Sequence, residues 1–205
     1  AHALDSSRIA LDIIGQHAGP ESFRYADALH SRGAALLAAR WAGEAPPALT
    51  RATEILRRAL TPQHNVTRGF AADQALALAS LGRYDEAEQL IHEMTPGDPP
   101  ADRSLTARLG HALGVARRLR GDYEDALRIQ QQSLASMDEN TTFDLTRMNV
   151  LTEIGLNLQE LARPEDASSA LEQALTLSRS SPTPMNPGRP DILVGLGRTK
   201  LRTGR

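Results

Sequence analysis

Six histidines are the residues of this chain best suited to metal binding or acid–base chemistry, and they stand at positions 2, 17, 30, 64, 92 and 111. None of them forms an HExxH pair or lies at ligand spacing from a second histidine and a carboxylate. The chain contains no cysteine, which excludes thiolate nucleophiles, disulfides and cysteine-ligated metals. We therefore expect no metal site and no cofactor, and we interpret the histidines as surface or groove residues.

A glycine-rich stretch near the end of the chain, GLGRTK at 195–200, comes nearest to a phosphate-binding loop, but it lacks the GxxxxGK[ST] spacing. The acidic pairs Glu124/Asp125 and Glu165/Asp166 stand where helices are expected to begin, and carboxylates favour the positive end of a helix dipole. The sequence shows no Ser/His/Asp arrangement that could be assigned to a catalytic triad. We therefore predict no enzyme within this segment.

The overall charge also restricts the class of partner. Charged residues make up 23% of the 205 residues and the formal net charge is −2, so nothing suggests binding to nucleic acid or to an anionic membrane. No apolar run approaches the ~18 residues that a membrane span needs. The chain opens on Ala1, carries no targeting signal and is expected to be cytoplasmic and part of a longer protein.

Apolar residues recur at helical spacing along the whole chain, and no alternating run is long enough for a strand. One helical pattern runs from Leu105 to Leu119, and a second begins at Tyr123 after the break at Gly121-Asp122. A connection this short predicts an antiparallel helix hairpin. The same layout predicts further helices over about 3–17, 21–42, 47–60, 66–81, 84–95, 142–162 and 189–203, and one that begins at Pro164.

Small residues recur with one period in these helices. Those in the middle of each first helix are spaced by 42, 39, 41 and 42 residues, and those early in three second helices by 39 and 41. A small side chain lets two helix backbones approach closely, so each should mark the crossing of a helix pair. A period near 40 with two helices per unit is typical of an α-solenoid. The two series are Gly33, Ala75, Gly114, Gly155, Gly197 and Ala87, Ala126, Ala167.

Two further glycines interrupt the stretch from 109 to 135. Gly121 lies at the turn, where a positive φ is useful. Gly110 has no counterpart in neighbouring units and the pattern does not explain it.

At this point the chain resembles the tetratricopeptide repeat family. The segment LGHALGVARRLRGDYEDALRIQQQSL (109–134) resembles one repeat, and the segments ADQALALASLGRYDEAEQLIHEM (72–94) and EIGLNLQELARPEDASSALEQAL (153–175) resemble two others. The period is longer than the basic ~34 residues of the family and is similar to that of kinesin light chains and many bacterial regulators. The resemblance implies an all-α fold, a right-handed α-solenoid superhelix of antiparallel helix hairpins.

The resemblance also implies one repeat domain over 1–205. It would contain a half-repeat at 1–18, repeats at about 21–61, 66–95, 101–138 and 142–180, and a half-repeat at 189–205.

In such a superhelix the first helices line the concave face. Residues six and three before each small residue, and one and four after it, share a stripe on that face, and the residues two before should edge it. Three basic members, Arg108, His111 and Arg118, favour an acidic or carboxylate-bearing segment of a partner. The full set of candidate groove residues is Asp27, His30, Asp73, Arg108, His111, Arg118, Asn149, Thr152, Glu153, Gln159 and Arg198.

The leading hypothesis is a non-catalytic protein-interaction module that binds a peptide or partner segment in its groove. It would be the scaffold or sensor part of a bacterial regulator, such as a kinase or transcription regulator. One alternative is a receptor for a small signal molecule or signal peptide that switches an attached effector domain. Another is a structural unit that associates with itself through the open half-repeat at 189–205.

Overall fold

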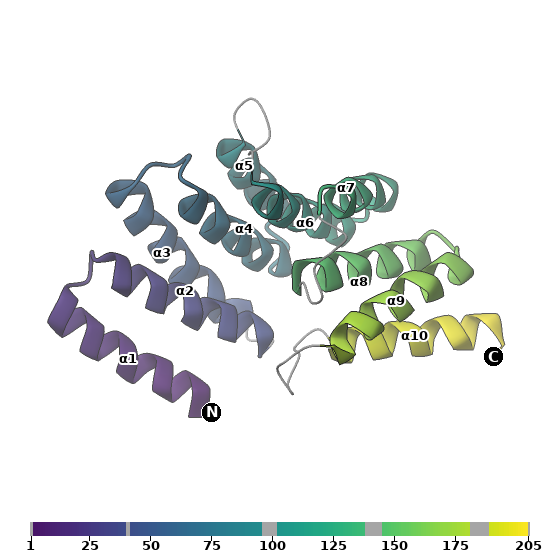
Figure 1. Cartoon of the computed structure of the whole chain (residues 1–205), viewed down its shortest axis with the longest axis horizontal. Helices are drawn as coiled ribbons and strands as arrows, with labels where there is room; N and C mark the ends of the chain where they lie inside the picture. Colours follow the sequence, from purple (N-terminus) through teal and green to yellow (C-terminus); the bar gives the residue numbers. More distant parts are fainter. Residues whose placement is uncertain (1, 40–41, 96–101, 138–144, 181–188, 205) are drawn as a thin grey trace. The chain divides into compact units, whose positions relative to one another are not determined.

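The computed structural model describes residues 2–39, 42–95, 102–137, 145–180 and 189–204 (Figure 1). These residues form α-helices and one short 3-10 helix, η1 (Ala42–Glu44), and contain no strand. The prediction of an all-α fold is confirmed. The helices are α1 (His2–Ala18), α2 (Phe23–Ala38), α3 (Ala45–Ala59), α4 (Asn65–Ser80), α5 (Tyr84–Met94), α6 (Arg103–Arg120), α7 (Tyr123–Ala135), α8 (Leu145–Glu160), α9 (Pro164–Arg179) and α10 (Arg189–Thr203).

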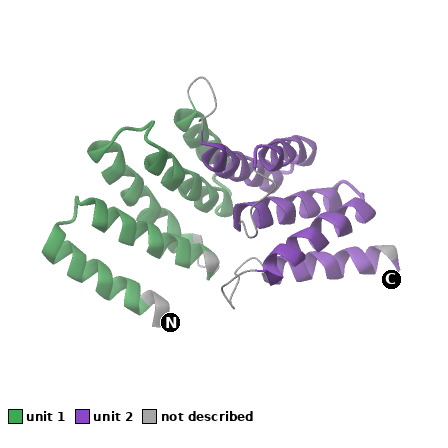
Figure 2. Ribbon diagram, in the orientation of Figure 1, with its two compact units in different colours: residues 1–99 green, residues 100–205 purple. Residues whose placement is uncertain are grey.

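The helices divide into two compact units, residues 1–99 and residues 100–205, which Figure 2 shows in green and purple. In the first unit α2 packs against α3 and α4 against α5; in the second α6 packs against α7 and α8 against α9. The first helices of successive pairs also contact one another, α2 with α4 in one unit and α6 with α8 and α8 with α10 in the other. Each unit is therefore a stack of helix hairpins.

Three small residues of the first helices lie under the second helix of the same pair, where the prediction places them, whereas Gly197 has no heavy atom within 4 Å of the position of its Cβ. A Cβ built on Gly155 would meet Leu171 Cγ at 2.5 Å, and one on Gly114 would meet Gln130 Nε2 at 2.6 Å. Gly33 is covered by Leu49 in the same way. Glycine is required at these positions because a larger side chain would push the two helices apart.

The structure also explains Gly110, which the repeat pattern does not. The side chain of Ser133 on α7 lies directly over it, in the space that a Cβ at residue 110 would need. Ser133 is itself buried and its Oγ donates to the Ile129 carbonyl at 2.9 Å. α6 therefore meets α7 closely at two successive turns.

Three turns between paired helices, α4–α5, α6–α7 and α8–α9, share one backbone geometry. The helix ends at a residue with positive φ, which is +77° at Gly82, +105° at Gly121 and +55° at Ala162. The N–H of the next residue then donates to the carbonyl five residues earlier, which closes the helix end as in a Schellman motif. These bonds are Arg83 N to Leu78 O at 3.0 Å, Asp122 N to Arg117 O at 2.9 Å, and Arg163 N to Leu158 O at 2.8 Å.

Candidate functional site

In the first unit, His30 and Asp73 are brought together from two neighbouring first helices. Nε2 of His30 on α2 lies 2.7 Å from Oδ2 of Asp73 on α4, and both side chains are largely buried. The imidazole also stacks on Phe70, with ring centroids 3.8 Å apart and an interplanar angle of 14°. His30 is therefore held by one contact on its edge and another on its face.

Asp27 stands one turn earlier on α2 and is exposed. It borders a cavity of about 380 Å³ between α1 and α2, whose lining is largely apolar and includes Ile14 and Phe23. Arg24 and Ser31 lie on the same rim. This part of the predicted face is accessible to another molecule.

In the second unit, Arg118 of α6 and Glu153 of α8 form an ion pair, with Nε and Oε2 2.5 Å apart. Their side chains are 19% and 16% exposed, so the pair is partly shielded from solvent. Arg108 and Asn149 are half-buried on the same two helices, and Arg108 takes part in an interaction of its own. This region supplies charged and amide groups from two adjacent first helices.

Three candidates are buried, and each takes part in an interaction within the protein. Gln159 Nε2 donates to the Gly195 carbonyl and to Thr199 Oγ1 on α10, each at 2.6 Å. Thr152 Oγ1 donates to the Met148 carbonyl at 2.8 Å. The third, His111, is 8% exposed. Arg198 on α10, by contrast, is exposed.

A common rule connects the three interhelical contacts. Asp73, Glu153 and Gly195 all stand two residues before the small residue of their helix, and each accepts a bond from the preceding first helix. The stripe predicted from the sequence assigns His30, Asp73, Arg118, Glu153 and Gln159 to a partner molecule and does not predict these bonds within the protein. The available signal was charge complementarity between neighbouring units, histidine before aspartate and arginine before glutamate.

Two other kinds of site are absent from the described ranges. No group of three or more His, Asp or Glu side chains there is arranged to hold a metal ion. None of the helices in that part of the chain has the length and apolarity needed to cross a membrane.

Comparison with known proteins supports the repeat assignment. The sequence profile of the tetratricopeptide repeat family matches residues 109–142. Two crystal structures of nearly identical TPR-like repeats, described as those of a Podosopora anserina kinesin light chain, have the same fold. One, a point variant, has a TM-score of 0.60 at 18% identity and covers 86% of this chain and 85% of its own. The other has a TM-score of 0.58 at 17% identity and covers 89% of each chain. No curated protein sequence matches the chain.

Proposed function

We propose that this chain of tetratricopeptide repeats is a non-catalytic protein-interaction module, which holds a peptide or partner segment along the faces of its first helices. Repeats of this family present extended surfaces for such contacts. One observation carries the proposal. Within each unit, polar side chains of adjacent first helices bond to one another, and Arg118 with Glu153 is the clearest pair.

The second unit supports an acidic partner segment. Glu153 accepts a hydrogen bond from Nε of Arg118. Because a guanidinium has five N–H donors, Arg118 retains donors for a ligand carboxylate. Arg108 lies on the same helix, and the side chain of Asn149 on α8 can both donate and accept. An amide with both capacities suits the backbone of an extended peptide.

The ion pair also has a structural role in this proposal. It fixes the guanidinium before a ligand arrives, so less conformational entropy is lost on binding. The same contact joins α6 to α8, the two helices that carry Arg108 and Asn149. We propose that the module serves as the scaffold or sensor part of a regulatory protein.

The test begins with acidic peptides selected from a random library on the wild-type chain. Their affinities are then measured for the double variant Arg108→Glu/Arg198→Glu, which reverses two charges on first helices. The matched control, Arg128→Glu/Arg179→Glu, makes the same charge change on the exposed second helices α7 and α9. Arg118 is left intact, because a glutamate there would face Glu153 and destabilise the fold.

We expect the first-helix variant to bind about tenfold more weakly or worse, because it loses charge-assisted hydrogen bonds, while the control binds as the wild type does. Thermal unfolding of each variant establishes that it is folded. Equal losses in both variants would show that net charge, and not the first-helix face, determines binding.

A further inference from the structure

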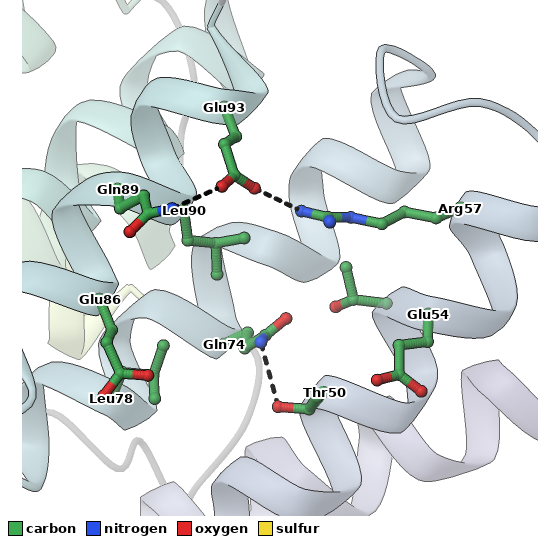
Figure 3. A pocket seen from close by; sticks show the side chains of 10 residues that line it. Thr50, Glu54, Arg57, Gln74, Leu78, Glu86, Gln89, Leu90 and Glu93 are labelled. Atoms are coloured by element: carbon green, nitrogen blue, oxygen red, sulfur yellow. Dashed lines mark hydrogen bonds and ion pairs between the residues drawn. The ribbon is translucent and has the colours of Figure 1, made fainter.

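A second cavity, of about 250 Å³, lies in the first unit between the second helices α3 and α5 and above α4 (Figure 3). The walls carry Glu54 and Arg57 from α3 and Glu86, Gln89 and Glu93 from α5. The remaining lining residues are Thr50, Thr53, Gln74, Leu78 and Leu90. None of these lining residues belongs to the set of candidate groove residues predicted from the sequence.

Hydrogen bonds fix side chains at two places in the cavity. Arg57 Nη2 donates to Glu93 Oε2 at 3.2 Å, and Gln89 Nε2 donates to the other oxygen of Glu93 at 3.0 Å. At the floor, Gln74 Nε2 donates to Thr50 Oγ1 at 3.0 Å, and its carbonyl oxygen is directed away from that bond into the open space (Figure 3). The floor therefore offers an acceptor to a ligand.

The remaining two carboxylates differ in how firmly they are held. Both oxygens of Glu86 accept from the Arg83 guanidinium at 2.6 Å, and this hydrogen bonding lowers the pKa of Glu86. Glu54 has only a 3.6 Å ion pair with Arg51, which is also paired with Glu21. Among the carboxylates of the cavity, Glu54 thus has the longest contact with its partner.

A cavity at the matching place in the second unit gives an internal comparison. It lies between α7 and α9 above α8 and has a volume of about 290 Å³. Its floor is apolar: Ile154 stands one residue before its small residue, as Gln74 does in the first unit. Leu134 of α7 likewise corresponds to Thr53 of α3, because each stands four residues after the side chain that covers the glycine of its pair. The hollow follows from the repeat architecture. Both cavities have polar walls, but the second is lined by one carboxylate, Asp166, whereas the first is lined by three.

We propose that the cavity between α3 and α5 binds a cationic side chain, lysine or arginine, of a partner protein. The carboxylate of Glu54 pairs with the positive charge of that side chain. The side-chain carbonyl of Gln74 accepts a hydrogen bond from another of its N–H groups. A cation is the matching ligand because the lining carries three carboxylates against one cation, Arg57, which already bonds to Glu93. Ammonium and guanidinium groups are pure donors. This site goes beyond the proposed function and would add a basic anchor to the partner.

The probes are single blocked residues. N-acetyl-arginine methylamide and N-acetyl-lysine methylamide are titrated into the whole chain, and the backbone amides of α3 and α5 are followed by NMR. The citrulline analogue is the control, because it has nearly the shape of the arginine compound but no charge. Glu54→Gln tests the site, and Glu172→Gln, which removes one exposed carboxylate of α9, is the matched variant.

We expect one or both cationic probes to shift amides of α3 and α5 but not those around the cavity between α7 and α9. Glu54→Gln should weaken that binding about tenfold, as expected for a lost charged hydrogen bond, while Glu172→Gln has no effect. Equal shifts from citrulline, equal shifts at both cavities or full binding by Glu54→Gln would each overturn the proposal. The peptide experiment on the first helices is unaffected by these outcomes.

Discussion

Arg118 and Glu153 lie 35 positions apart in the sequence, yet their side chains meet at 2.5 Å between two neighbouring first helices. His30 and Asp73 meet at 2.7 Å in the other unit, so the arrangement occurs in both. In each case the acceptor stands two residues before the small residue of its helix. These contacts between polar side chains of first helices therefore link successive repeats within each unit.

The link between Arg118 and Glu153 should be measurable as a coupling energy. We expect a double-mutant cycle with Arg118→Met and Glu153→Gln to give about 1 kcal/mol, because the pair is partly shielded from solvent. The exposed pair Arg163–Asp166 should give a few tenths of a kcal/mol at most. Urea denaturation of each set of four proteins supplies the free energies of unfolding. Equal coupling in the two pairs would contradict a structural role for the first.

Two glycines of the same series should respond oppositely to alanine. Gly155→Ala should destabilise the fold by about 1–3 kcal/mol, because the new methyl group would overlap Leu171. Gly197 has no heavy atom within 4 Å of the position of its Cβ, and Gly197→Ala should gain up to about 1 kcal/mol from helix propensity. Thermal and urea unfolding measure both. The same sign of change in both variants would refute the close approach.

Ala162 is the one residue other than glycine with a positive φ in the described part of the chain. Gly82 and Gly121 take the equivalent place in two other hairpins. Because the left-handed conformation costs an L-residue about 1–2 kcal/mol, Ala162→Gly should stabilise the fold by about 0.5–1 kcal/mol after the added freedom of the unfolded chain is deducted. Gly121→Ala should have the opposite effect. Melting temperatures that fall for Ala162→Gly would contradict this reading of the turn.

Gln130 is fully buried, and neither its Oε1 nor its Nε2 has a hydrogen-bond partner. Leu49 and Leu171 take the same place over the small residues of their own pairs. We expect Gln130→Leu to raise the free energy of unfolding by about 1–3 kcal/mol, because it removes an unpaired buried amide. Gln131→Leu on the exposed side of α7 is the control and should change little. A destabilised Gln130→Leu protein would mean that the amide is satisfied in solution.

Much of the fold could be predicted from the sequence because its signals are local. Helical periodicity marked the helices, and the spacing of glycine and alanine marked the crossings, as Gly114 under Gln130 shows. Gly110 could not be explained, because its reason is Ser133 on the next helix, a contact that belongs to one pair and does not repeat. The sequence does not indicate the positive φ of Ala162, because alanine itself disfavours that conformation and the end of the helix imposes it.

The site was harder to predict than the fold. The spacing within a single helix predicts the stripe, and it puts His30 and Arg118 on the first helices. Their bonds to Asp73 and Glu153 depend on the offset between neighbouring helices, which a single-helix pattern does not contain. The burial of Gln159 has the same origin, because α10 covers it.

Chemical-shift mapping of a selected acidic peptide on the labelled chain tests the central claim most directly. The account predicts that the largest shifts fall on first helices, at Arg108 of α6 and Asn149 of α8, with little change along α7 and α9. Shifts concentrated on α7 and α9 with α6 and α8 unaffected would contradict it.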